Sequence, residues 1–206
     1  LLLKPVYFTL SIFSKKTRNK PEAWRPLGYI PNLGLQLKAE NQHSMLSSQK
    51  VQLYHDILSR IMFSLVEFQQ RGAMPFHLSY RGQQCDVRFK FPLLAILGDT
   101  ESHDRLCGRY NMRGINTARL CHHCDTPTHE TATVDYLWHH ILPEDIETLL
   151  AHGDFQGLKN ISQHPNRNAF YDGVCLAGNH RGIHGMTPVE PLHLLELGLF
   201  KYAIEG

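Results

Sequence analysis

The run Phe91-Pro92-Leu93-Leu94-Ala95-Ile96-Leu97-Gly98-Asp99 decides how the rest of the chain is interpreted. Six of the eight residues from Phe91 to Gly98 are apolar, and a carboxylate follows them without a polar transition. A short continuous apolar run is typical of a strand that is covered on both faces of a sheet. The carboxyl end of such a strand is where mixed α/β sheets bind their ligands. We therefore expect a buried strand that presents Asp99 to a site.

The composition sets limits on the class of protein. The chain has 206 residues, of which 42% are hydrophobic and 19% are charged, so it can bury a core. The formal net charge of +2 does not by itself indicate a nucleic-acid partner, and a basic surface would have to be local. No stretch approaches ~18 consecutive apolar residues, so we expect no membrane span. The five cysteines include a Cys-x-x-Cys motif, which in a reducing compartment indicates metal or redox chemistry.

Upstream of the apolar run, the sequence predicts a hairpin followed by a long helix. Residues 6–13 and 24–31 are rich in β-branched and aromatic side chains, which are typical of strands. A basic, polar turn joins them. After Ser47-Ser48, apolar side chains recur at steps of three and four as far as Arg71-Gly72, which predicts a helix of about six turns. Residues 75–80 then predict a further strand, and a turn separates it from residues 85–97.

Downstream of Asp99 the character of the sequence changes. Residues 107–128 are loop-like and rich in Arg, His and Cys, whereas residues 143–152 and 154–161 predict two short helices. A last helix is expected from Thr187-Pro188 onward, with Thr187 as its N-cap. We therefore divide the chain into residues 1–106, 107–128 and 129–206.

Asp99 permits two interpretations. Asp99 and its neighbours Thr100, Glu101, His103 and Asp104 offer the side chains from which two-metal phosphoryl-transfer sites are built. Hard oxygen ligands favour Mg²⁺ or Mn²⁺. The other interpretation is that Asp99 only caps a helix that begins near Glu101.

Cys121 and Cys124 are spaced to hold one tetrahedral zinc ion, for which they supply two ligands. Within the chain, His180 and His184 are the best remaining pair, and weaker candidates are Cys107, His103 and Cys175. The alternatives for the motif are a redox pair or inert thiols. For His180 and His184, the alternative is a turn with solvent-facing imidazoles.

Two further groups of residues are candidates. Glu190, His193 and Glu196 are spaced by three on the last expected helix, where they could be metal ligands, a second acid, or a capping box with surface residues. Basic residues that could neutralise DNA phosphates, or simply be solvated, gather before the second strand and before the cysteines; these are Lys15, Lys16, Arg18, Lys20, Arg105, Arg109, Arg113 and Arg119.

The order of LLAILGD, CHHC and TPVEPLHLLELGLFKY, preceded by KPVYFTLSIFSKKTRNKPEAWRPLGYIPNL, resembles the CACTA and Plavaka-like group of eukaryotic cut-and-paste DDE transposases. The resemblance implies an α/β (α+β) fold: an incomplete ribonuclease-H-like mixed sheet with a long helix, then a zinc-knuckle-like loop and a helical insertion. It implies that Asp99 is the second of three catalytic acids and that Cys121 and Cys124 form half of a structural zinc site. It also places the first and third acids and the last zinc ligands outside the chain, so Glu190 is not assigned as the third acid.

The resemblance leads to a functional expectation. We expect an incomplete, transposase-derived domain for metal-dependent cleavage and transfer of DNA strands, inactive alone, that acts on transposon ends in the nucleus and could form a homo-oligomer. Mg²⁺ or Mn²⁺ would serve the reaction, and Zn²⁺ would stabilise the fold. The alternative is a zinc-stabilised module that binds nucleic acid or protein without catalysis.

Overall fold

A computed structural model describes residues 3–32, 47–110, 117–119, 121, 123–130 and 138–188 of the chain. The chain divides into two compact units. Unit 1 comprises residues 1–94 and 172–175, and unit 2 comprises residues 95–171 and 176–206. Each unit is built from its own elements and is described separately.

Unit 1 begins with the expected amino-terminal hairpin. Strand β1 (Leu3–Phe8) pairs antiparallel with β2 (Arg25–Pro31), and the connection holds α1 (Lys15–Arg18) and η1 (Pro21–Ala23). The expected turn therefore contains short helices, because Ser14 caps α1 and Pro21 starts η1.

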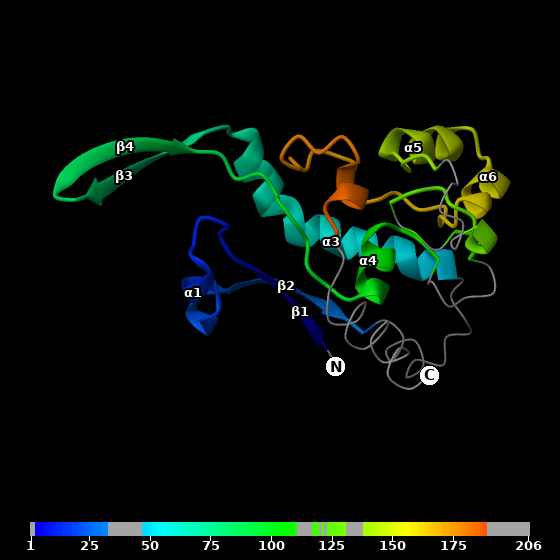
Figure 1. Ribbon diagram of the computed structural model, residues 1–206, viewed down its shortest axis with the longest axis horizontal. Helices are drawn as coiled ribbons and strands as arrows, with labels where there is room; N and C mark the ends of the chain where they lie inside the picture. The colour runs from blue at the N-terminus through cyan, green and yellow to red at the C-terminus, as the bar shows by residue number, and fades with distance from the viewer. Residues whose placement is uncertain are drawn as a thin grey trace. The chain divides into compact units, whose positions relative to one another are not determined.

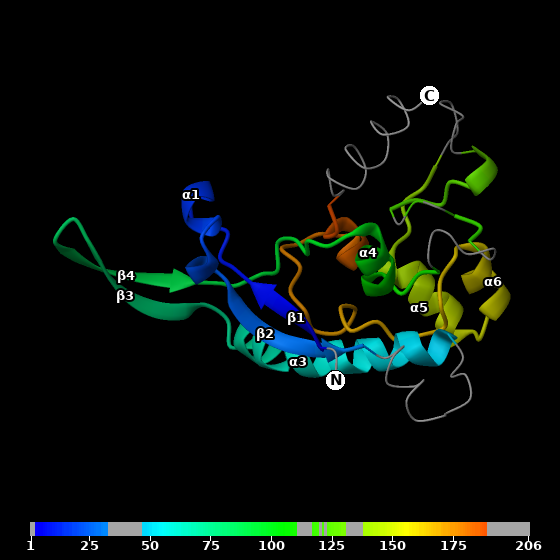
Figure 2. The same cartoon turned by 90° about the horizontal axis from the view of Figure 1, so that it is seen from below.

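The long helix α3 (Ser47–Gln70) is confirmed, and it packs against β2 (Figures 1 and 2). Its side chains Leu58 and Met62 are buried. A Cβ atom at Gly28 of β2 would lie 2.8 Å from Cγ1 of Ile61, so the absence of a side chain at Gly28 permits the close approach of strand and helix.

A second hairpin follows the helix. Strand β3 (Met74–Tyr80) pairs antiparallel with β4 (Gln83–Phe89) across the expected Arg81-Gly82 turn, and both views show it extending beyond the carboxyl end of α3 (Figures 1 and 2). The rings of Phe68, Phe76, Phe89 and Phe91 are neighbours at its base, with centroid separations from 4.9 to 6.1 Å.

The expectation of a buried strand before Asp99 is wrong. Residues 90–99 form neither strand nor helix, and Leu94 and Leu97 are 52% and 72% exposed. Pro92 has no N–H to donate, and the N–H groups of Leu93 and Ile96 donate to carbonyl groups of two different loops, at Cys175 and Met186. The segment therefore bonds to loops where a strand would need a neighbouring strand.

Unit 2 is helical, with polar loops. Its helices are α4 (Thr100–Leu106), α5 (Pro143–Ala151) and α6 (Phe155–Asn160), and it also holds η2 (Thr128–Glu130) and η3 (Gly182–Gly185). Ile141, Ile146 and Leu158 form a buried apolar cluster between α5 and α6. The two short helices expected from the sequence are therefore confirmed, and the expected last helix lies outside the described residues apart from Thr187 and Pro188.

The mixture of helices and strands is confirmed in its coarse form. The described residues contain two separate antiparallel sheets of two strands each, β1–β2 and β3–β4. The mixed sheet of a ribonuclease-H-like core is not among them. No described helix is long and apolar enough to cross a bilayer.

Candidate functional site

Asp99 is the N-cap of α4. Its Oδ1 accepts a hydrogen bond of 2.7 Å from the backbone N–H of Ser102, the interaction that a capping side chain makes with the third residue of a helix. The carboxylate is exposed. The capping interpretation of Asp99 is therefore realised, and the same side chain remains accessible from solvent.

The neighbours of Asp99 on α4 point in different directions. Glu101 and Arg105 form an ion pair on the exposed side of the helix, whereas His103 and Asp104 are buried, with 2% and 1% of their surface exposed. The carboxylates that follow Asp99 in the sequence are thus divided between solvent and core. They do not gather around Asp99 as ligands of one ion.

A buried arginine follows α4 directly. The chain turns at Gly108, which has a φ of +71°, and Arg109 then enters the core with 2% of its surface exposed. Its guanidinium donates to the carbonyl oxygens of Cys121 and of Arg119, the latter at 2.5 Å. The segment that carries the first cysteine is therefore held by a buried cation.

The charge on Arg109 has to be maintained away from water. Burial lowers the pKa of its guanidinium, while the carboxylate of Asp104 acts in the opposite direction. Cys107 is itself buried, and burial raises its pKa to about 12. Cys107 is accordingly a neutral core thiol.

Cys121 and Cys124 are both partly buried and carry free thiols. The backbone N–H of His123 donates to Sγ of Cys121 at 3.4 Å, and Sγ of Cys124 lies 3.2 Å from Oγ1 of Thr126. Cys124 also forms an isolated antiparallel bridge with His140. Each sulfur atom therefore has its own polar neighbour in the loop.

The redox alternative for these cysteines stays a prediction, and the environment of Cys121 does not activate its thiol. Burial is the main cause that raises the pKa of Cys121 above its ordinary value. A thiol that exchanges disulfides readily has a lowered pKa, because the thiolate is the nucleophile. The local environment of Cys121 has the opposite effect.

The described part of the chain does not complete a metal site. It contains no group of three or more His, Cys, Asp or Glu side chains arranged to hold an ion. The described residues do not bring His180 and His184 together with Cys121 and Cys124, and the zinc site that these four residues would form stays a prediction. His180 is exposed, whereas His184 is fully buried in η3 and its Nε2 lies 3.1 Å from the hydroxyl of Tyr171. Cys175, one of the weaker candidates, lies in unit 1.

Besides Arg105, which pairs with Glu101, three basic candidates have structural contacts. Arg18 donates to the carbonyl groups of Ser11 and Phe13 at 2.7 and 2.9 Å and so closes its own turn. Arg119 donates through Nε to the carbonyl of Asn160 at 3.2 Å, and Arg109 is buried. Lys15 and Lys16 are exposed on α1 and remain accessible to an anion.

Four candidates lie outside the described residues: Arg113, Glu190, His193 and Glu196. Sequence reasoning also missed a group of buried polar residues in the segment between α6 and η3, which it classed only as irregular. Gln163, His164, Asn166 and Asn168 are between 1% and 6% exposed. A signal was present, because four amide or imidazole side chains within six residues are unusual for a solvated loop that carries only one charged residue.

Comparison with known proteins identifies the class. A family model described as Plavaka transposase matches residues 3–204, which is nearly the whole chain. The chain is therefore a member of a transposase family. Specifically, it belongs to the Plavaka transposase family, as the resemblance of its motifs predicted. A search of curated proteins and a search of solved structures each find no match.

Proposed function

We propose that this chain is a transposase-derived domain for metal-dependent DNA strand cleavage and transfer, in which Asp99 supplies one of the acidic metal ligands. The observation that carries the proposal is the family match over residues 3–204, together with an exposed carboxylate at the position that the resemblance assigns to the second acid. In such a reaction, divalent ions neutralise charge on the transferred phosphoryl group and activate the attacking oxygen.

We further propose that the chain does not complete this chemistry alone. The described residues offer Asp99 without a group of three ligands around it. Mg²⁺ or Mn²⁺ would thus need ligands beyond the described residues. We expect the purified chain not to nick supercoiled DNA with either ion, and nicking that is lost on Asp99→Asn would overturn this expectation.

The role of Asp99 as a ligand can be separated from its role as a cap. Asn caps helices about as well as Asp, so Asp99→Asn keeps the hydrogen bond to Ser102 and removes the negative charge. Asp154 caps α6 in the same way, accepting from the N–H of Gly157 at 2.8 Å, and Asp154→Asn is therefore a matched control.

Titration with Mn²⁺ followed by electron paramagnetic resonance tests the assignment. We expect Asp99→Asn to lose at least tenfold in Mn²⁺ affinity, whereas Asp154→Asn keeps the affinity of the wild type. Identical titrations for the two variants would remove Asp99 from the metal site and leave it as a cap.

DNA binding is the second element of the proposal. We propose that Lys15 and Lys16, exposed on α1, contact phosphates. Each neutralised phosphate contributes about −0.9 to the slope of log K against log salt concentration. The double change Lys15→Gln, Lys16→Gln is expected to reduce the slope by nearly two. An unchanged slope would place the DNA elsewhere.

The alternative function, a zinc-stabilised binding module without catalysis, is favoured by a different observation. Arg109 anchors the segment of Cys121, the first residue of the Cys-x-x-Cys motif, from the core. Zinc content measured by mass spectrometry tests the site, with Cys124→Ser expected to lose one equivalent and the exposed Cys175→Ser to retain it. Zinc that Cys124→Ser retains would remove the motif from metal binding. If the chain binds zinc and Asp99→Asn does not alter the Mn²⁺ titration, the binding module is favoured over the catalytic domain.

A further inference from the structure

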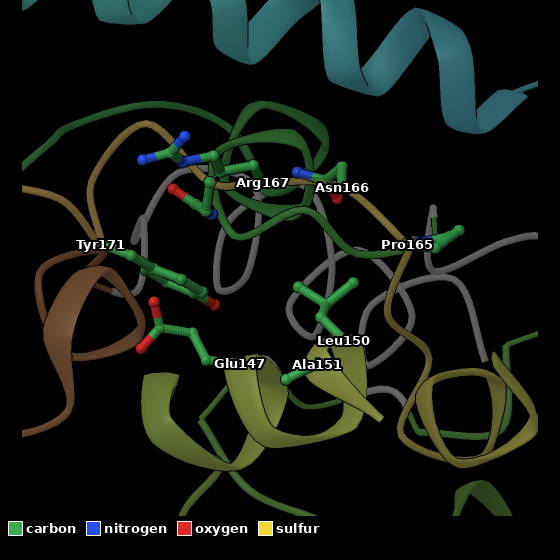
Figure 3. Close-up of a pocket in the computed structure, with 8 residues that line it drawn as sticks. Glu147, Leu150, Ala151, Pro165, Asn166, Arg167 and Tyr171 are labelled. Atoms are coloured by element: carbon green, nitrogen blue, oxygen red, sulfur yellow. The ribbon is translucent and has the colours of Figure 1, made fainter. Parts of the chain in front are cut away.

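Unit 2 contains a cavity of about 380 Å³ between α5 and the segment that follows α6 (Figure 3). Two polar side chains that line it already bond within the protein. The amide of Asn168 donates to a backbone carbonyl at 2.9 Å, and the hydroxyl of Tyr171 lies 3.1 Å from Nε2 of His184. Glu147 and Arg167 contribute opposite charges to the lining, so the cavity favours a ligand of neither sign. The β3–β4 hairpin of unit 1 is a more selective surface.

The β3–β4 hairpin is exposed along most of its length. Beyond pairing with each other, β3 and β4 pack along no other helix or strand among the described residues, and the hairpin extends past the carboxyl end of α3 (Figures 1 and 2). Each strand has seven residues, which span about 24 Å at 3.4 Å per residue. A two-stranded hairpin is at best marginally stable in water by itself. A hairpin of this length without a covering layer therefore indicates a surface for a partner.

The strand register gives the hairpin one apolar face and one polar face. Side chains alternate between the faces along each strand, and residues opposite one another share a face. Phe76, Leu78 and Val87 lie on the apolar face. The ring of Phe76 lies near those of Phe89 and Phe91 at the base of the hairpin, with centroid separations of 5.3 and 6.0 Å. The hairpin's own aromatic residues therefore cover a part of the apolar face.

The polar face carries side chains that form hydrogen bonds. His77 lies opposite Asp86, and its Nδ1 is 2.5 Å from Oδ1 of Asp86. Ser79 lies opposite Gln84, and Arg88 is on the same face because it follows Asp86 by two positions. Ser79, Gln84 and Arg88 are exposed. Gln and Arg are the side chains that make bidentate contacts with adenine and guanine, respectively, in the major groove of DNA.

The hairpin is also basic. Residues 74–90 contain three cations, Arg81, Arg88 and Lys90, and one carboxylate, Asp86. Their formal net charge is therefore +2 with His neutral, which equals that of the entire chain of 206 residues. The carboxylate of Asp86 is already paired with His77. The three cations are exposed, and none belongs to an ion pair between described residues. The hairpin thus presents unpaired positive charge from its turn to its base.

We infer that the β3–β4 hairpin lies in the major groove of a DNA duplex, with its polar face toward the bases. The major groove is about 12 Å wide and admits a two-stranded ribbon, whereas the minor groove is only about 6 Å wide. Gln84 and Arg88 then meet base edges, while Arg81 and Lys90, at the two ends of the ribbon, meet phosphates. A protein partner on the apolar face would leave this charge unpaired. The inference rests on the proposed function, since that function supplies the DNA.

Fluorescence anisotropy of the complete chain with a mixed-sequence duplex tests the inference. Arg88→Gln is expected to weaken binding about fivefold or more, the lower end of what one bidentate base contact contributes. Arg60→Gln, an exposed change on α3, is the matched control and is expected to change the affinity less than twofold. Leu78→Thr, on the apolar face, is likewise expected to change it less than twofold. A duplex whose pyrimidines carry bulky groups at C5, which project into the major groove, is expected to bind at least tenfold more weakly.

Each contrary result overturns the inference. Equal effects of Arg88→Gln and Arg60→Gln would remove the hairpin from the DNA interface. A loss on Leu78→Thr as large as that on Arg88→Gln would place the partner on the apolar face, and full affinity for the C5-substituted duplex would exclude the major groove. If Lys15→Gln, Lys16→Gln reduces the salt slope and the hairpin variants bind like the wild type, the hairpin inference alone is refuted. A chain that binds no duplex refutes the inference and the proposed DNA binding together.

Discussion

Replacing Arg109 with Met tests whether a buried cation holds the cysteine segment to unit 2. Methionine keeps an unbranched apolar stem of similar reach and removes the guanidinium. The change eliminates the hydrogen bonds to the carbonyl oxygens of Cys121 and Arg119. It also removes the positive charge next to Asp104, which is 1% exposed.

The expected loss of stability follows from these contacts. A hydrogen bond that involves a charged group contributes about 1.5–3 kcal/mol, so the two bonds of Arg109 together contribute about 3–6 kcal/mol. Removal of the charge near Asp104 acts in the same direction, because a buried carboxylate without a nearby cation is destabilising. Hydration of the carbonyl groups of Cys121 and Arg119, which are only partly buried, offsets a part of this loss of stability. We therefore expect Arg109→Met to lower the free energy of unfolding by about 4 kcal/mol.

Urea unfolding followed by circular dichroism measures this loss, and a thiol reagent reports the local effect. Cys121 and Cys124 are expected to react faster in Arg109→Met than in the wild type, because their segment is no longer held. Arg105→Met is the control, since Arg105 is partly exposed and its i,i+4 pair with Glu101 contributes only about 0.3–0.5 kcal/mol. If Arg109→Met loses less than 1 kcal/mol and its thiols react at the wild-type rate, the buried cation does not hold the segment.

Two further predictions concern the segment around Asn166. Burial lowers the pKa of His164 from 6.5 to about 4, so its neutral form stabilises the fold fully above pH 6.5, and we expect about 2 kcal/mol to be lost by pH 5 and about 3 kcal/mol by pH 4. Unfolding titrations against pH check this, and a slope between pH 6.5 and 4 that is as steep in His164→Gln as in the wild type would contradict it. Gly108→Ala is expected to lose about 3 kcal/mol, because it combines a left-handed φ with a Cβ atom 2.8 Å from the amide of Asn166. Gly153→Ala, at a φ of +65° with nothing within 4 Å, is expected to lose only about 1 kcal/mol in the same urea assay.

The sequence predicted the elements that depend on contacts between residues close to one another in the sequence. Helix α3 follows from a stripe of apolar residues at three- and four-residue steps, and the β3–β4 hairpin follows from alternation around Arg81-Gly82. Arg81 and Gly82 both have positive φ, at 51° and 78°, which a tight turn of this kind requires. Such features are local, and a pattern within some twenty residues contains them.

The apolar run before Asp99 was misjudged for a physical reason. A continuous apolar segment indicates that its side chains favour burial. It does not indicate which groups will accept the hydrogen bonds of its backbone. In unit 1 Leu93 finds the carbonyl of Cys175, and in unit 2 Ile96 finds that of Met186, each about eighty to ninety residues away in sequence. Contacts at such separations leave no periodic signal.

The contacts that support the candidate site could not be predicted from the sequence. The Cys-x-x-Cys spacing indicates two zinc ligands, which stays a prediction, and the structure shows Arg109 holding the segment of the first cysteine from the core. The cation that holds this segment came from the group of arginines that we interpreted as either phosphate contacts or solvated loop charges. The sequence does not show whether an arginine binds a DNA phosphate or two backbone carbonyl groups. The forked guanidinium can donate hydrogen bonds to either kind of acceptor. Only burial distinguishes them.

Asp99 shows how the two interpretations of one residue can both hold. The cap uses Oδ1, and the position at the start of α4 keeps the carboxylate at the surface rather than among the buried residues of the same helix. A metal ligand at a helix N-terminus is fixed in direction by its cap, which limits the side-chain freedom lost when an ion binds. Capping therefore does not count against a catalytic role for Asp99. It predicts that a change which keeps the cap and removes the charge will separate folding from metal binding, whereas Asp99→Ala would impair both and could not distinguish them.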